Sequence, residues 1–126
     1  MAKKIVILDQ SEKMSGFSEY LNVFGGFDCI VIDLDRQASE DMVEKVKKEC
    51  ADIVIFEAFF FLQNDGYKLI EEIAKSQLNL IIIAHTTQDK PRDEFQDMMN
   101  KGIIKKWFSK TRDDIGDVIV EINQLL

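Results

Sequence analysis

Several polar side chains stand directly after apolar runs of this chain, and two of them are acids while one is a base. They are Asp9, Gln10, Glu57, Ser109 and Lys110. If the apolar runs are neighbouring strands, two carboxylates and one amine converge in a partly screened pocket, where opposite charges pair. We therefore predict a permanent ion pair between Glu57 and Lys110. A plainer interpretation is that Glu57 is a solvated carboxylate at the end of a strand.

The elements that would position these side chains alternate along the chain. Apolar runs recur at residues 5–8, 29–32, 53–56, 80–83 and 103–108. Continuous apolar runs are typical of strands buried on both faces, and the segments between them carry apolar residues at helical spacing. Five such strand-helix units predict an α/β fold with a parallel sheet covered on both sides, because strand-helix-strand crossovers are right-handed. Ligands bind such sheets beyond the carboxyl ends of the strands, which is where the polar residues fall.

Composition favours one compact domain spanning residues 1–126. Hydrophobic residues make up 46% and charged residues 31% of the chain, which is a globular balance. The net charge of −7 disfavours nucleic acid and anionic lipid as partners. The longest apolar stretches are far shorter than a membrane span, and no signal-peptide core follows the first residues. We expect a cytoplasmic protein that binds proteins or small ligands.

The chain resembles a response-regulator receiver domain of the chemotaxis type over essentially its whole length. Five segments carry the resemblance, in the right order and spacing: residues 5–11, 51–57, Asp65-Gly66, 79–85 and 107–110. The resemblance implies a flavodoxin-like (βα)5 sheet with strand order 2-1-3-4-5. It also implies a Mg²⁺ held by acidic residues, in-line attack by an aspartate on a phosphodonor, and a lysine and a hydroxyl that stabilise the aspartyl phosphate.

Departures from the family pattern concentrate in the implied phosphorylation pocket. Gln10 stands where the family has a second acid, so a neutral amide replaces a charged ligand of Mg²⁺. Glu57 stands at the phosphoacceptor position and reaches roughly 1.5 Å further than aspartate, against the roughly 1 Å tolerance of in-line transfer. We expect no resident cofactor. Asp9 and Glu57 would hold Mg²⁺ weakly if it binds.

Two further departures concern the switch hydroxyl and the residue after the lysine. Alignment through Asn79 places Ala84 at the switch position, which leaves no hydroxyl for a phosphoryl oxygen, whereas counting back from Gly102 selects Thr87 instead. Thr111 follows Lys110 where the family has a proline after a cis peptide bond.

Aromatic residues supply the remaining candidates. Phe59, Phe60 and Phe61 occupy a loop position and form either a partner-binding patch or a cap folded over the core. Trp107 corresponds to the switch aromatic of receivers, although such a residue is more often a half-buried strand residue. His85 is the only histidine and has no metal-binding companion nearby, so we expect it to cover the pocket or to form a local hydrogen bond.

The function that these features favour is a stand-alone, degenerate receiver domain that acts as a phosphorylation-independent interaction module in bacterial two-component, chemotaxis or motility signalling. The expected partner is a signalling protein, and the expected state is a monomer or weak homodimer. The alternative is a working phospho-receiver that binds Mg²⁺ and accepts phosphate from a histidine kinase. A flavodoxin-like ligand-binding protein is disfavoured because an acid, Glu12, lies in the loop that would bind phosphate. Catalysis is not expected, because no nucleophile has an adjacent base, and residual autophosphorylation is left open.

Overall fold

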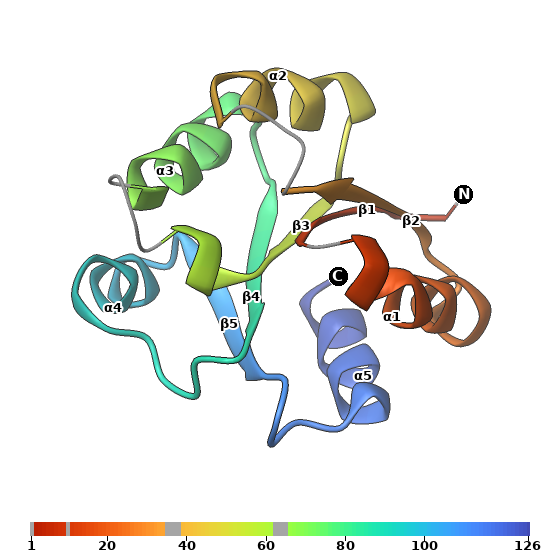
Figure 1. Ribbon diagram of the computed structural model, residues 1–126. Coiled ribbons are helices and arrows are strands. Elements are labelled where there is room, and N and C mark those ends of the chain that lie inside the picture. Colours follow the sequence, from red (N-terminus) through yellow and green to blue (C-terminus); the bar gives the residue numbers. More distant parts are fainter. Residues whose placement is uncertain (1, 10, 35–38, 62–65) are drawn as a thin grey trace.

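The computed structural model describes residues 2–9, 11–34, 39–61 and 66–126, and within them the strands form one parallel sheet. The strands are β1 (Lys4–Asp9), β2 (Asp28–Asp33), β3 (Ile53–Phe56), β4 (Ile81–Thr86) and β5 (Ile104–Ser109). Their order across the sheet is β2-β1-β3-β4-β5, as the resemblance implied (Figure 1).

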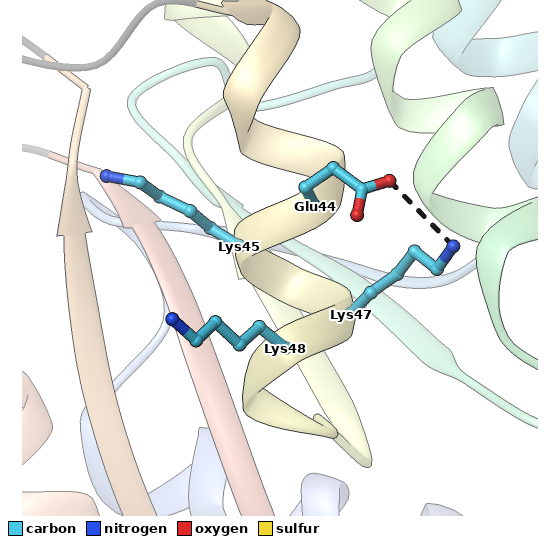
Figure 2. Close-up of a pocket in the computed structure, with 4 residues that line it drawn as sticks. All are labelled: Glu44, Lys45, Lys47 and Lys48. Atoms are coloured by element: carbon cyan, nitrogen blue, oxygen red, sulfur yellow. Dashed lines mark ion pairs between the residues drawn. The ribbon is translucent and has the colours of Figure 1, made fainter.

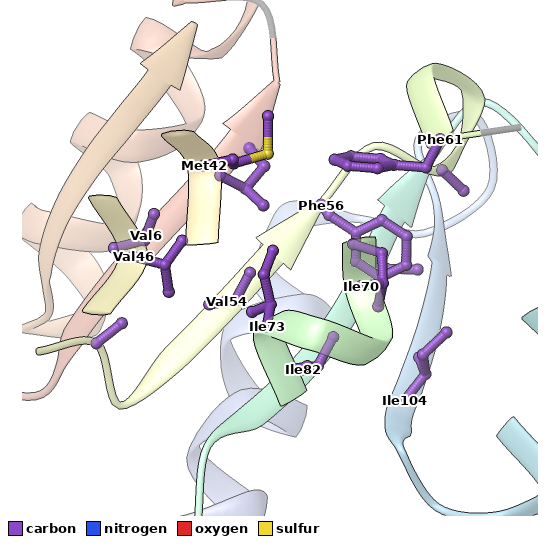
Figure 3. Packing of buried hydrophobic residues seen from close by; sticks show 14 of the residues in the cluster. Val6, Met42, Val46, Val54, Phe56, Phe61, Ile70, Ile73, Ile82 and Ile104 are labelled. Atoms are coloured by element: carbon purple, nitrogen blue, oxygen red, sulfur yellow. The ribbon is translucent and has the colours of Figure 1, made fainter. Parts of the chain in front are cut away.

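Helices cover both faces of this sheet. One face is covered by α1 (Ser11–Gly25) and α5 (Ile115–Leu125), and the other by α2 (Ser39–Glu49), α3 (Gly66–Ser76) and α4 (Asp93–Asn100) (Figure 1). The apolar runs alternate between the two faces. Val6 and Leu8 of β1 pack toward α2 and α3, whereas Ile5 and Ile7 pack toward α1 and α5. The first of these two cores is drawn in Figure 3. Burial on both faces thus explains why the strands read as continuous apolar runs.

The end of β4 and the pairing of β4 with β5 depart from the simple pattern of the prediction. The apolar run of the fourth strand ends at residue 83, but β4 continues through His85 to Thr86, both of which are buried. In β5 the pairing with β4 shifts between Ile82 and Ile83, which places Lys105 as an extra residue between Ile104 and Lys106. Both irregularities lie on the strands that lead to the predicted site.

The charge-rich helix α2 has one buried face and one solvated face. Met42 and Val46 are buried against the sheet, while Glu44 and Lys47 form an exposed pair at 3.8 Å. Figure 2 shows this surface.

Within the ranges that the structure describes, no helix is long and apolar enough to cross a membrane.

Candidate functional site

The carboxyl ends of four adjacent strands bring the predicted charged residues together. Asp9 is the last residue of β1, Glu57 follows β3, Thr86 ends β4, and Lys110 follows β5. Because parallel strands end at the same edge of the sheet, these side chains meet although they lie far apart in sequence. Gln10, which was predicted to belong to the same pocket, lies outside the described residues.

Lys110 bridges the two carboxylates. Its Nζ lies 3.2 Å from Glu57 Oε1, which confirms the predicted ion pair, and 2.6 Å from Asp9 Oδ2. The Asp9 and Glu57 side chains are only 3% and 4% exposed, and that of Lys110 is 16% exposed. The sequence prediction paired Lys110 with Glu57 alone. The structure gives the shorter contact to Asp9, so one ammonium serves two buried anions.

Glu57 also accepts hydrogen bonds from both neighbouring loops. The Thr87 N–H donates to its Oε1 at 3.0 Å and the Phe59 N–H to its Oε2 at 3.2 Å. Burial by itself would raise the pKa of Glu57, but the hydrogen bonds from the Thr86 hydroxyl and the Thr87 N–H, the charge of Lys110 and the Phe59 N–H together lower it. Glu57 is therefore a fixed anion at neutral pH.

The hydroxyl beside Glu57 belongs to Thr86, which neither alignment had selected. Ala84 pairs with Phe56 across the sheet and lies fully buried in the apolar core, below the site. The alignment that placed Ala84 at the switch position, and so left the pocket without a hydroxyl, does not agree with this geometry, and the alternative alignment selected the neighbouring Thr87 rather than Thr86. Thr86 takes this position because β4 is longer than predicted and continues for two residues after Ala84. Continued alternation from Ile82 through Ala84 to Thr86 was the sequence signal that could have found it.

Trp107 links β5 to the loop after β4. It is half-buried and lies beside Ala84, its ring centroid is 5.9 Å from that of Phe95 in α4, and its Nε1–H donates to the Gln88 carbonyl at 2.8 Å. The loop that supplies a donor to Glu57 is thus also anchored to β5 through Trp107.

A polar network holds the turn that carries Lys110. The Lys110 N–H donates to the Thr86 carbonyl at 2.8 Å. The Ser109 hydroxyl donates to Asp89 Oδ1 at 2.6 Å, and the Thr111 hydroxyl donates to the same oxygen at 3.1 Å. No peptide bond in the described ranges is cis. Thr111 thus ties the lysine turn to the loop after β4, a role of Asp89 and Thr111 that the sequence analysis missed.

The three successive phenylalanines do not form one surface patch. They lie on a short 3-10 helix, η1 (Ala58–Phe61). Phe61 is only 3% exposed, and its ring packs edge-on against that of Phe56 with the centroids 5.6 Å apart (Figure 3), so for this residue the structure agrees with the cap over the core and not with the patch. Phe59 is 54% exposed. The side chain of Phe60 lies outside the described part of the structure.

His85 lies on the opposite face of the sheet, toward α1. It is buried, and its ring stacks on Phe17 at a centroid distance of 4.4 Å. Burial, followed by the charge of Lys110, lowers the pKa of His85 to about 4. Its Nδ1 has no hydrogen-bond partner among the described residues, so that nitrogen does not form the local hydrogen bond that was one of the two expectations for His85. His85 is therefore neutral at pH 7 and acts as an aromatic packing residue.

The described residues fit Mg²⁺ poorly. No three histidine, cysteine or acidic side chains of the described ranges are grouped so that they could hold a metal ion. The two available carboxylates, Asp9 and Glu57, share the ammonium of Lys110, which a dication would have to displace. Mg²⁺ prefers several oxygen ligands in octahedral geometry and gives up its water reluctantly. Among the described residues of the pocket, both carboxylates thus contact a lysine.

Comparison with known proteins supports the fold assignment. By sequence, the chain matches no family model and no curated protein. By structure, it is similar to a CheY-like response regulator receiver domain protein from Methanospirillum hungatei JF-1, with 16% identity, a TM-score of 0.73, and coverage of 98% of this chain and 93% of that one. The chain has the receiver fold, with its parallel sheet in the order 2-1-3-4-5.

Two further solved structures support the same assignment. A LuxR-family DNA-binding response regulator from Staphylococcus aureus is 18% identical with a TM-score of 0.72, covering 99% of this chain and 98% of that one. A response regulator from Desulfuromonas acetoxidans is 17% identical with a TM-score of 0.74, covering 98% and 95%. These are therefore likenesses of fold at low sequence identity.

Proposed function

We propose that this chain is a degenerate receiver domain that acts by binding a signalling protein, without phosphorylation. The observation that carries the proposal is the set of donors around Glu57. The ammonium of Lys110, the hydroxyl of Thr86 and two backbone N–H groups all interact with one carboxylate. In receivers, the lysine and the hydroxyl are the groups that stabilise a phosphoryl group, and here a permanent anion occupies them.

The burial of Glu57 also disfavours phosphorylation. Phosphoryl transfer needs an oxygen free to attack in line, held within roughly 1 Å of its productive position. Glu57 is 3% exposed, and both of its oxygens already accept hydrogen bonds. Attack would require breaking the contact with Lys110 and at least one backbone hydrogen bond. The fixed pair therefore does structurally what a phosphoryl group does transiently, and it keeps the loops after β3 and β4 in one arrangement.

The partner would recognise the surface that these loops form. Glu57 holds the backbone of Phe59 and Thr87, and Trp107 holds Gln88, so the shape of this surface depends on the ion pair. Similarity to response regulators supports bacterial two-component, chemotaxis or motility signalling as the setting. We expect a monomer or weak homodimer in the cytoplasm.

The test is an NMR titration of isotope-labelled protein with Mg²⁺ and beryllofluoride, a mimic of the phosphoryl group. We expect no saturable shift of the backbone signals of Asp9, Glu57 and Lys110. Saturable shifts at these positions would overturn the proposal in favour of the working phospho-receiver. The Glu57→Asp variant is the matched control, because it restores the length of a phosphoacceptor and leaves Lys110 and Thr86 in place.

A second measurement addresses the interaction itself. Proteins captured from native lysate by the wild type, Glu57→Ala and Glu57→Gln are compared by mass spectrometry. A specific signalling partner should be retained by the wild type and lost with Glu57→Ala, whose loops lose their common acceptor. Equal capture by all three proteins would separate partner binding from the ion pair and contradict the proposed mechanism.

A further inference from the structure

A basic cleft lies next to the Glu57 site, within the surface formed by the loops after β3 and β4. It has a volume of about 680 Å³ and is lined by Phe59, the loop of residues 87–92 and Arg112. Loops after β3, β4 and β5 thus contribute to one depression at the carboxyl edge of the sheet. Ligand sites of open parallel sheets form at this edge, and pockets for small organic ligands measure roughly 300–1,000 Å³.

The charge of the cleft is opposite to that of the molecule. Lys90, Arg92 and Arg112 line it together with one acid, Asp89, on a chain whose net charge is −7. Arg112 Nε pairs with Asp89 Oδ2 at 3.4 Å. No salt bridge in the described part of the chain involves Lys90 or Arg92. The cleft therefore has two cations that no acid of the described ranges neutralises by contact.

The chemistry of these cations favours a phosphate group as the ligand of the cleft. A guanidinium group presents a planar set of donors that matches phosphate or carboxylate oxygens in pairs, and the compact ammonium of a lysine adds a point charge. Two arginines and one lysine from two different loops can surround one phosphate or two linked ones. A single carboxylate would leave most of these donors without a partner.

An exposed aromatic ring completes the lining. Phe59 is 54% exposed, and its backbone is fixed because its N–H donates to Glu57 Oε2. An aromatic face at the wall of a basic cleft provides a stacking surface for a planar ring. Thr87, on the other wall, also donates to Glu57, so the same carboxylate fixes both walls.

We propose that this cleft binds a nucleotide, with its base stacked on Phe59 and its phosphates held by Arg92, Arg112 and Lys90. The site goes beyond the interaction function and does not depend on it, because a working phospho-receiver would have the same cleft. Since Glu57 holds both walls, a bound nucleotide stabilises the arrangement of the loops that the Glu57–Lys110 pair already favours.

The test is isothermal titration calorimetry of the purified protein with adenine and guanine mono-, di- and triphosphates. Adenosine, inorganic phosphate and a polyglutamate peptide are the comparison ligands. We expect at least one nucleotide to bind, more tightly than either adenosine or inorganic phosphate, and with an affinity that falls as salt is added. Stacking of a base on an aromatic ring predicts at least a roughly fivefold loss of affinity for Phe59→Ala. Arg92→Glu should also weaken binding, because it reverses one of the two unpaired charges.

Matched control variants separate the cleft from general effects of charge and exposed aromatic area. Lys105→Glu makes the same charge reversal near the amino end of β5, at the opposite edge of the sheet from the cleft, and Phe24→Ala removes an exposed phenylalanine from α1. Both should bind nucleotide like the wild type. Three results would overturn the proposal: no nucleotide binding at millimolar concentration, equal affinity for inorganic phosphate, or binding of the acidic peptide alone. Equal losses in control and cleft variants would also overturn it.

Discussion

Replacement of Lys110 by methionine tests whether one ammonium holds two buried carboxylates together. Methionine keeps much of the volume and flexibility of the lysine stem but removes the charge that lies 2.6 Å from Asp9 and 3.2 Å from Glu57. Removing one partner of a buried ion pair costs about 3–5 kcal/mol, because an uncompensated charge remains. Here two carboxylates lose their partner, so we expect a loss of unfolding free energy near the upper end of that range at pH 7. The loss is large against a total stability of about 5–15 kcal/mol.

The pH dependence of that loss identifies its origin. The pKa of Glu57 lies below its ordinary value of 4.5, so its ionised form stabilises the wild type above pH 4.5, and this contribution disappears as the pH falls through the folded-state pKa. In Lys110→Met the pKa of Glu57 is no longer lowered by the charge of the lysine, so this buried carboxylate takes up a proton more readily. The stability difference between wild type and variant should therefore be largest at neutral pH and shrink toward pH 4.

Urea denaturation followed by circular dichroism at pH 4, 5, 6 and 7 measures these differences. The double variant Lys110→Met/Glu57→Gln is the internal control, because it removes one of the two stranded charges and should recover part of the lost stability. A loss below about 1 kcal/mol that does not change with pH would refute the buried-bridge interpretation, since that is the behaviour of an exposed pair.

Three further predictions concern the surroundings of the site. His85→Phe should flatten the pH dependence of stability. The pKa of His85 is 6.5 in the unfolded chain and about 4 in the folded one, so the unfolding free energy of the wild type falls by about 3 kcal/mol as the pH is lowered from 6.5 to 4. If the unfolding free energy of the variant, measured by urea denaturation, changes with pH as steeply as that of the wild type, His85 is not a buried neutral histidine. Phe61→Ser should lower the unfolding free energy by at least about 3 kcal/mol because the ring is buried, whereas Phe59→Ser should change it by no more than about 0.5 kcal/mol because that ring is exposed. Similar losses in the two variants, measured by urea denaturation, would contradict this difference in burial. Gly66→Ala should destabilise by about 1–3 kcal/mol in the same assay, since a Cβ there would lie 2.6 Å from the Phe61 carbonyl oxygen, and a neutral effect would disprove that close approach.

The loops at the carboxyl edge of the sheet are held by side chains of the chain itself. Glu57 anchors the loops after β3 and β4, and the Asp89 network anchors the loop after β5 to the loop after β4. In the function proposed above, these contacts are what would give a partner one constant surface to bind.

Much of the architecture could be predicted from the sequence, because it follows from local patterns. Continuous apolar runs separated by segments of helical spacing are sufficient to predict buried parallel strands with helices on both faces. The ends of those strands, together with the types of residue found there, predicted that Glu57 and Lys110 would meet. Opposite charges brought to one partly buried edge have few alternatives to pairing.

Tertiary structure decided which neighbours complete the site. Asp9 shares the ammonium of Lys110, and Thr86 rather than Ala84 or Thr87 supplies the hydroxyl, because β4 extends three residues beyond its apolar run. A one-residue change in the position of a strand exchanges the side chains that face a site, and the apolar run alone did not show where β4 ends.

Tertiary structure also decided which of the three successive phenylalanines is buried. Phe59 and Phe61 are equally apolar and almost adjacent, yet a turn of 3-10 helix directs one toward solvent and buries the other against Phe56. The basic cleft likewise joins residues from three loops that are separate in sequence. The sequence by itself determined the sheet and the charges at its edge. The tertiary structure determined which groups those charges contact, because contacts between distant loops depend on the register and length of every strand.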